Sequence, residues 1–265
     1  MTSCVHHEYI ELAGLRTHLI RSAPQVDTVF LHGVGGSCWT FEHTLSALKV
    51  ELNWASVDLL GYGESSWLPR GEEYSTQIQA RRVRDVLDRL GASQVNLVGF
   101  SWGGLIALEV AAQCSIVDRL VVIDIPPSSA LAPESVAAIP WRYHDTEAAI
   151  ETMGRLAPNA PRHVLERDAL LSTTVDELGV RRKLDPRLLE RYVFRAEDHW
   201  ATWDANKRPK LLVRGQNSPV LSAEAAAMMT RRAPSVSFVE IAGTGHMIPL
   251  EQPDQLARVV GEFLR

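Results

Sequence analysis

The chain has 265 residues, of which 46% are hydrophobic, and it carries a formal net charge of −5. This length and apolar fraction predict one large domain, with or without an insertion. The acidic balance gives no electrostatic basis for binding nucleic acid or an anionic membrane. No hydrophobic run approaches the roughly 18 residues that a membrane-spanning helix needs. The cysteines Cys4, Cys38 and Cys114 are scattered and form neither a disulfide framework nor a zinc-binding pattern. We therefore expect a cytoplasmic protein without a metal or redox cofactor.

The first ninety residues predict four strands and two helices. The strands are expected at residues 5–10, 15–21, 28–31 and 54–57, and the helices at 39–49 and 75–90. The third strand ends in the glycine-rich stretch His32-Gly33-Val34-Gly35-Gly36-Ser37, whose spacing matches neither common phosphate-binding pattern. We favour a loop whose backbone N–H groups face a site on the neighbouring strand. Asp58 follows the fourth strand and is interpreted as a turn residue that bonds its own loop.

A Gly-x-Ser-x-Gly pattern, with Ser101 at its centre, joins an apolar run at 95–100 to a helical pattern from Trp102 to about Cys114. A sharp strand-to-helix turn would hold the serine hydroxyl clear of the backbone. Gly99 and Gly103 relieve the crowding in such a turn because they lack a Cβ. The N-terminus of the following helix favours negative charge nearby. The pattern therefore predicts a nucleophilic serine beside a site for an oxyanion.

The rest of the chain predicts three more strands and a large insertion. A buried strand at 119–125 contains Asp124 near its end. Residues 128–207 carry helical segments, prolines and clustered aromatic residues but no convincing strand, so we expect a helical insertion over the sheet. The remaining strands are expected at 211–215 and 236–241, and the remaining helices at 223–232 and 253–264. His246 lies in a tight loop after the last strand.

Strands that alternate with helices predict a parallel sheet with helices on both faces. In such sheets, ligands bind beyond the carboxyl ends of the strands. The glycine-rich loop, Ser101, Asp124 and His246 all lie at strand ends of this kind. We therefore expect them to converge in space although they are far apart in the sequence.

These residues together resemble the α/β-hydrolase superfamily, in its serine-nucleophile members with a helical cap domain. The resemblance rests on His32-Gly33, Asp58-x-x-Gly61-x-Gly63-x-Ser65, Gly99-x-Ser101-x-Gly103-Gly104, Arg214-Gly215 and Gly245-His246-Met247. It implies a mostly parallel eight-stranded sheet with helices on both faces. It also implies a core made of residues 1–127 and 208–265, with the cap, residues 128–207, inserted after the sixth strand. One fold hosts many reactions, so the resemblance does not fix the chemistry.

The resemblance assigns roles to individual residues. Ser101 would be the nucleophile and His246 its general base. The backbone N–H groups of Trp102 and Val34 would form the oxyanion hole. Many members place the triad acid after the strand before the last, where this chain has Ser218. Some place it after the strand that follows the elbow helix, where Asp124 stands.

We therefore expect Asp124 to be the triad acid, which also preserves the order Ser, Asp, His. The alternative is that Asp124 supports only the cap hinge and the local backbone. Asp204, at the cap junction, is a less favoured candidate for the acid.

The cap is the expected specificity element. The aromatic residues expected to line a substrate pocket are Trp39, Trp141, Tyr143, Trp200 and Trp203. The alternative is that most of the cap aromatics form the core of the cap itself. The expected partner is a small, largely apolar substrate, and the expected assembly is a monomer or homodimer.

The favoured function is hydrolysis of a carboxylic ester, or a related acyl bond, through an acyl-enzyme. One alternative uses the same Ser-His site in a C–C bond hydrolase, or in a lyase or cyclase of a biosynthetic pathway. A second alternative is a non-catalytic ligand receptor on the same fold. Epoxide hydrolase and haloalkane dehalogenase chemistry is disfavoured, because those relatives place an Asp nucleophile where Ser101 stands.

Overall fold

The structure is a computed structural model, and it describes residues 5–128, 139–190, 197–233 and 235–265. An eight-stranded sheet forms its centre, with the strand order β1-β2-β4-β3-β5-β6-β10-β11. These strands are His6–Leu12, Leu15–Arg21, Trp54–Val57, Thr28–Leu31, Val95–Phe100, Val117–Ile123, Lys210–Gly215 and Val236–Ile241. Only β2 runs against the other seven, because β1 and β4 each pair with it in antiparallel fashion. The prediction of a mostly parallel eight-stranded sheet is confirmed.

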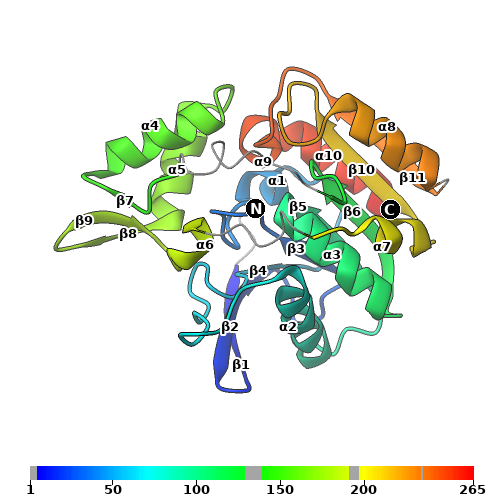
Figure 1. Ribbon diagram of the computed structural model, residues 1–265, viewed down its shortest axis with the longest axis horizontal. Coiled ribbons are helices and arrows are strands. Elements are labelled where there is room, and N and C mark those ends of the chain that lie inside the picture. The colour runs from blue at the N-terminus through cyan, green and yellow to red at the C-terminus, as the bar shows by residue number, and fades with distance from the viewer. Residues whose placement is uncertain (1–4, 129–138, 191–196, 234) are drawn as a thin grey trace.

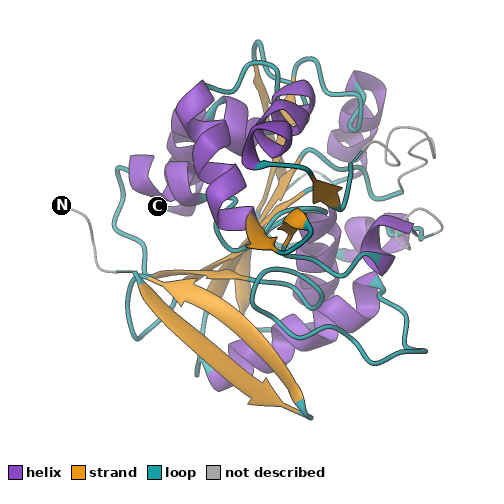
Figure 2. Cartoon of the chain, turned by 90° about the vertical axis from the view of Figure 1, so that its left-hand side faces the viewer, coloured by secondary structure: helices purple, strands orange, loops and turns teal. Residues whose placement is uncertain are grey.

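Helices cover both faces of the sheet, as Figure 2 shows. One face carries α1 (Glu42–Ala47), α9 (Ile248–Glu251) and α10 (Pro253–Leu264). The other carries α2 (Thr76–Arg89), α3 (Trp102–Gln113) and α8 (Ala223–Arg232). Every residue of β3 and β4 is buried, and strands covered on both faces read as continuous apolar runs. This pattern made the central strands predictable.

Helix caps explain why several boundaries were also predictable. The Ser75 hydroxyl accepts a hydrogen bond from the Ile78 N–H, and the Ser222 hydroxyl accepts one from the Ala225 N–H. Each bond satisfies an N–H group that has no partner inside its helix, which stabilises a helix start by about 1 kcal/mol. The first predicted helix, 39–49, is shorter than expected. Its regular part is α1, because Trp39 and Thr40 take part in turns instead.

Most of the described residues between β6 and β10 lie to one side of the main sheet (Figure 1), and we refer to this segment as the cap. It contains β7 (Arg142–Tyr143), α4 (Thr146–Leu156), α5 (Arg162–Ser172), β8 (Thr173–Asp176), β9 (Gly179–Arg182), α6 (Arg187–Glu190) and α7 (Trp200–Ala205). The expectation that this segment contains no strand is wrong. Strands β7, β9 and β8 form an antiparallel sheet, and strands of two to four residues are too short for a visible alternation in the sequence.

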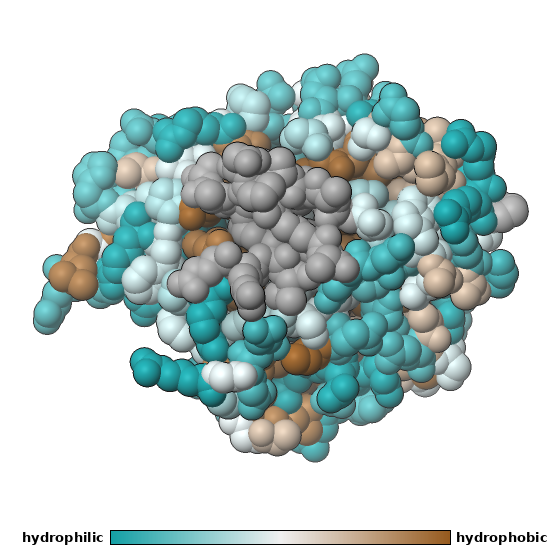
Figure 3. Space-filling view, viewed as in Figure 1, coloured by the Kyte–Doolittle hydropathy of each residue, from teal (hydrophilic) through white to brown (hydrophobic). Residues whose placement is uncertain are grey.

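Two further features of the cap were not predicted from the sequence. The β8–β9 hairpin carries exposed apolar side chains, Val175 and Leu178, and Figure 3 shows hydrophobic residues at its tip. Helix α7 lies inside the predicted cap range, yet it packs against α3. Its Trp203 is fully buried in the cluster that covers the main sheet. By its packing, α7 therefore belongs with the core of the molecule.

Candidate active site

Ser101 occupies the sharp turn between β5 and α3. Its backbone has φ 53° and ψ −127°, a conformation that L-residues other than glycine rarely adopt. Its N–H donates to the Ile123 carbonyl at 2.8 Å, which ties the turn to the neighbouring strand. Such strain persists where the surrounding structure fixes it, and it clusters at functional sites. The serine is thereby held at the carboxyl end of the sheet.

The glycines of the pattern are required by close backbone contacts. A Cβ on Gly99 would lie 2.2 Å from the Gly103 carbonyl oxygen, and a Cβ on Gly103 would lie 2.2 Å from the Leu31 carbonyl oxygen. The glycine-rich loop after β3 approaches just as closely, since a Cβ on Gly33 would lie 2.7 Å from the Cβ of Ser101. The loop that carries Val34 is therefore packed directly against the serine.

His246 and Asp124 meet Ser101 from two other strand ends. His246 Nε2 lies 3.1 Å from Ser101 Oγ, and His246 Nδ1 lies 2.6 Å from Asp124 Oδ2. The Asp124 carboxylate accepts from the Nδ1–H group, which leaves the Nε2 lone pair facing the serine hydroxyl. The structure thus brings the three residues into one hydrogen-bonded chain, with Asp124 fully buried and His246 partly exposed.

Asp124 is held by more than the histidine. Its backbone has φ 55°, and its Oδ1 accepts from the Gly215 N–H at 2.9 Å. The Ser218 hydroxyl donates to Oδ2 and accepts from the N–H groups of Val220 and Leu221. The loop of Ser218 therefore supplies a hydroxyl that holds the Asp124 carboxylate at the end of the neighbouring strand. The absence of an Asp at position 218 is visible in the sequence, but the contact between Ser218 and Asp124 is not.

Asp204, the less favoured acid candidate, lies elsewhere. It forms an ion pair with Arg232 on the surface, and both side chains are about 40% exposed. Because this carboxylate already has a partner on α8, it is not available to orient His246. The structure does not bring it into the site.

His32 and Asp58 shape the loop beside the serine. His32 Nε2 accepts from the Leu59 N–H, so Nδ1 is the donor to the Gly33 carbonyl oxygen. Burial lowers the pKa of His32, which favours this neutral form. Asp58 accepts from the N–H groups of Cys38 and Glu64. Burial acts to raise the pKa of Asp58, but the hydrogen bond from His18 and nearby positive charge hold it below its usual value.

Among the described residues, one group offers three ligand types that could hold a metal ion. It consists of His18, Cys38 and Asp58, whose ligand atoms lie within 4.8 Å of one another and are buried. His18 Nδ1 and Asp58 Oδ2 are 2.7 Å apart in a hydrogen bond. Burial raises the pKa of the Cys38 thiol well above its usual value, so the thiolate that metals bind is disfavoured. The group is accounted for as a buried hydrogen-bond network.

A small cavity of about 40 Å³ lies against Phe100, which precedes Ser101, and Met247, which follows His246; Ser101 and His246 themselves do not line it. It is lined by residues next to the site, Val34, Phe100 and Met247, and by residues of the cap, Met153, Leu156 and Arg182. Asp168 and Leu250 also line it. None of these cap residues was predicted from the sequence to line the pocket. Met153 and Leu156 lie three residues apart on α4, a spacing that also fits the buried face of any helix.

The aromatic residues predicted to line the pocket do not line this cavity. Trp203 Nε1 donates to the Met229 carbonyl oxygen in the core, and Trp200 stacks under Arg232 at 4.5 Å. Trp141 Nε1 donates to the Leu184 carbonyl oxygen. Trp39 lies beside the ring of His7. Of these residues, Tyr143 contacts a residue that lines the cavity, because its hydroxyl accepts a hydrogen bond from Arg182 Nε at 2.9 Å. These side chains support the cap and core instead.

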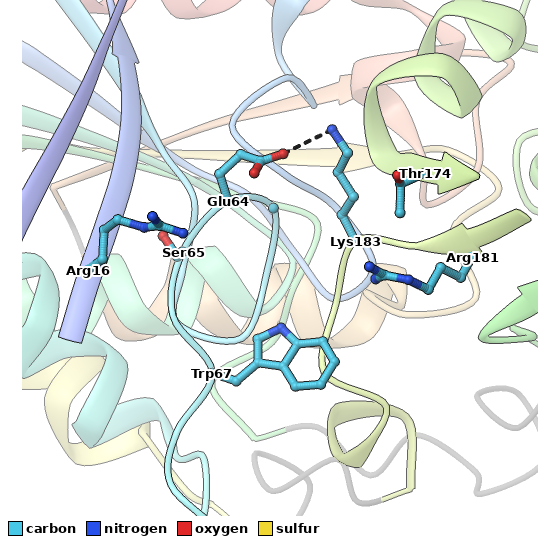
Figure 4. Close-up of a pocket in the computed structure, with 8 residues that line it drawn as sticks. Arg16, Glu64, Ser65, Trp67, Thr174, Arg181 and Lys183 are labelled. Carbon is cyan, nitrogen blue, oxygen red and sulfur yellow. Dashed lines mark ion pairs between the residues drawn. The ribbon is translucent and has the colours of Figure 1, made fainter. Parts of the chain in front are cut away.

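A second cavity, of about 310 Å³, lies between the loop at 63–67 and the hairpin β8–β9. Its wall is polar, with Arg16, Arg181 and Lys183, and Lys183 pairs with Glu64 at 3.0 Å. Figure 4 shows these side chains around the opening, with the ring of Trp67 below them. No member of the Ser101 chain of hydrogen bonds lines it.

Comparison with known proteins agrees with this architecture. The sequence pattern of the alpha/beta hydrolase family matches residues 28–259. The chain belongs to the alpha/beta hydrolase family. It is an enzyme of that family, in agreement with the prediction.

Two bacterial relatives match this hydrolase over most of their length. The esterase Rv0045c of Mycobacterium tuberculosis is 30% identical over 90% of this chain and 82% of its own. A 3-hydroxybutyrate-oligomer hydrolase of Cupriavidus necator is 28% identical over 86% of this chain and 85% of its own. A solved E-2-(acetamidomethylene)succinate hydrolase covers 98% of this chain with a TM-score of 0.89 at 20% identity, which supports the fold alone. Within the described part of the hydrolase, no helix is long and apolar enough to cross a membrane.

Proposed function

We propose that this hydrolase cleaves a carboxylic ester of a small, largely apolar substrate through an acyl-enzyme. The observation that carries the proposal is the hydrogen-bonded chain from Ser101 through His246 to Asp124 at a strained turn. A serine hydroxyl is a weak nucleophile until an adjacent base accepts its proton. In this proposal the histidine accepts that proton, and the buried carboxylate orients the imidazole and stabilises its charged form.

The reaction follows from this geometry. Ser101 Oγ attacks the ester carbonyl carbon while its proton passes to His246 Nε2. The tetrahedral intermediate then expels the alcohol, which takes that proton, and leaves an acyl group on Ser101. In the second half, water attacks the acyl carbon and gives a proton to Nε2. The tetrahedral intermediate then expels Ser101 Oγ, which takes that proton, and the carboxylic acid is released.

The developing oxyanion needs hydrogen-bond donors. We propose the backbone N–H groups of Val34, which lies in the loop packed against Ser101, and of Trp102, the first residue of α3. One such donor contributes about a hundred- to a thousand-fold in rate. The positive end of α3 adds to the same effect.

The relatives support ester hydrolysis as the reaction class. The relatives named for ester cleavage include an esterase, a 3-hydroxybutyrate-oligomer hydrolase and a mouse sn-1-specific diacylglycerol lipase, which is 26% identical over 89% of this chain. Other relatives are named epoxide hydrolases. Because these substrates differ, the specificity of this chain has to be argued from its own cavity.

The test is the turnover of p-nitrophenyl butyrate together with the intact mass of the protein after a rapid acid quench. We expect turnover by the wild type and a transient mass increase of one butyryl group on Ser101. The Ser101→Ala variant should show neither. Turnover by Ser101→Ala at the wild-type rate would rule out the serine mechanism. A butyryl adduct without turnover would favour the lyase, cyclase or C–C hydrolase alternatives.

A further inference from the structure

Two charged side chains line the largely apolar cavity next to Phe100 and Met247, and the hydrolytic mechanism uses neither. Arg182, at the end of β9, has a side chain that is 3% exposed. Asp168, on α5, lines the same cavity. Burying a charged group is costly unless polar partners replace the lost water. The question is therefore which partners these two groups have.

Only some of the N–H groups of the Arg182 guanidinium have a strong hydrogen-bond acceptor. Its Nε donates to the Tyr143 hydroxyl and its Nη1 donates to the Gly35 carbonyl oxygen, both at 2.9 Å. Its Nη2 faces the sulfur of Met153, and a thioether is a weak acceptor. Among the described residues, no carboxylate lies within ion-pair distance of Arg182. One arm of the guanidinium therefore lacks a strong acceptor at the cavity wall.

Asp168 presents a carboxyl group to the same space. Burial raises the pKa of this carboxyl above its usual value, although the charge of Arg182 and a hydrogen bond from Ser172 act in the opposite direction. A raised pKa means that the ionised carboxylate is incompletely stabilised by its surroundings. A ligand that donates a hydrogen bond to the Asp168 carboxylate would stabilise its ionised form. The wall of the cavity thus holds both a donor and an acceptor.

The chemistry of this pair discriminates among acyl chains. A plain alkyl chain would displace water and leave both polar groups unpaired. A terminal carboxylate would satisfy Arg182 but would face the charge of Asp168. A hydroxyl group can accept from a guanidinium and donate to a carboxylate at the same time. The cavity of about 40 Å³ has space for roughly three water-sized groups, which restricts the acyl chain to a few atoms.

We propose that the acyl part of the substrate is a short hydroxyacyl group, whose hydroxyl accepts a hydrogen bond from Arg182 and donates one to Asp168. This inference rests on the proposed ester hydrolysis at Ser101. The same guanidinium also holds the Gly35 carbonyl, in the loop that carries Val34. Recognition of the hydroxyl would therefore be coupled to the position of an oxyanion donor.

The test compares three p-nitrophenyl esters with four-carbon acyl chains: butyrate, 3-hydroxybutyrate, which carries a hydroxyl at C3, and monosuccinate, which carries a carboxylate at C4. For the wild type we expect kcat/KM on 3-hydroxybutyrate to exceed that on butyrate by about a hundredfold or more. Sites built to bond a substrate hydroxyl reject analogues that lack it by large factors, because the buried polar groups are left unpaired. Monosuccinate should be the poorest substrate. A wild type that prefers butyrate, or treats it equally, would overturn the inference.

Asp168→Asn provides a test that a misfolded protein cannot imitate. Removal of the negative charge should raise kcat/KM on monosuccinate relative to butyrate, while the preference for 3-hydroxybutyrate falls at least tenfold. The matched control is Glu166→Gln, on the same helix but exposed and paired with Arg162, which should keep the wild-type order of substrates. If Asp168→Asn also keeps the wild-type order, the proposed role of the carboxylate is wrong.

Labelling of Ser101 by a fluorophosphonate separates the two proposals. A labelled wild type that hydrolyses the esters without a preference for the hydroxyl keeps the proposed function and rejects this inference. An unlabelled, inactive wild type rejects both.

Discussion

At the scale of single residues, the position of the carboxylate is the feature that distinguishes this site. Asp124 accepts from Gly215, Ser218 and His246, so its carboxylate is both anchored and oriented. An Asp at position 218 would bring a second negative charge against Asp124. The serine there and the aspartate on the neighbouring strand are therefore physically compatible, because a hydroxyl can donate to the carboxylate.

This arrangement predicts the effect of moving the acid. Asp124→Asn should lower kcat by up to about four decades, as loss of the orienting carboxylate does in the serine-protease template. Adding Ser218→Asp to that variant returns a carboxylate to the same side of the imidazole and should recover at least tenfold. The measurement is kcat on p-nitrophenyl butyrate, with Asp204→Asn as a control that keeps wild-type activity. A loss below threefold for Asp124→Asn would remove Asp124 from the triad.

The sequence allowed part of this site to be predicted. Ser101 and His246 stand in glycine patterns with strong local constraints, and Asp124 was accessible because strand ends of a parallel sheet meet at one edge. The residues that line the pocket could not be predicted in the same way. The directions of Trp203 and Trp200 depend on partners such as Met229 and Arg232, which lie elsewhere in the sequence, so composition alone could not place them.

At the scale of elements, the strand-to-helix turn is the most constrained part of the fold. Gly99→Ala and Gly103→Ala would each place a Cβ 2.2 Å from a backbone oxygen, and backbone atoms cannot yield as a flexible side chain can. We expect either variant to lose activity by at least a hundredfold and to unfold at a lower temperature. The matched control is Gly154→Ala on α4, where the nearest atom is 3.5 Å away. That change should be neutral or stabilising by about 0.5–1 kcal/mol, because alanine favours a helix interior.

Thermal unfolding and ester turnover of the three variants check this prediction. A Gly99→Ala protein with wild-type activity would mean that the turn adjusts more easily than its contacts imply.

The strands of the cap, unlike the strand-to-helix turn, could not be predicted from the sequence. The strands β8 and β9 have four residues each, so no alternation of apolar and polar residues could be recognised in the sequence.

At the scale of the whole molecule, a buried charge network joins the end of the cap to the core. His199 Nδ1 lies 2.8 Å from Glu109 on α3, and His199 Nε2 lies 3.2 Å from Glu197. Glu197 also bonds Thr76, which accepts from Trp102 Nε1. Burial acts to lower the pKa of His199, but the hydrogen bonds to the two carboxylates raise it to about 9.

This network predicts a pH-dependent stability. Because the pKa of His199 in the folded state lies above the unfolded value of about 6.5, its stabilisation is fully present below that pH and is lost as the pH rises toward 9. Between pH 7 and 8 we expect the free energy of unfolding to fall by about 1 kcal/mol. Urea unfolding at several pH values measures this change in the free energy of unfolding. His199→Gln should be less stable and should lose this slope, whereas His144→Gln, at an exposed position, should keep it. An unchanged slope in His199→Gln would contradict the assignment.

The central claim is that Ser101 is activated by His246. The most direct measurement is the intact mass after exposure to a small fluorophosphonate, on the wild type and on Ser101→Ala, His246→Ala and the control His144→Ala. We predict one adduct on the wild type and on His144→Ala, and none on Ser101→Ala or His246→Ala over the same time. No adduct on the folded wild type, or equal labelling of His246→Ala, would contradict the account.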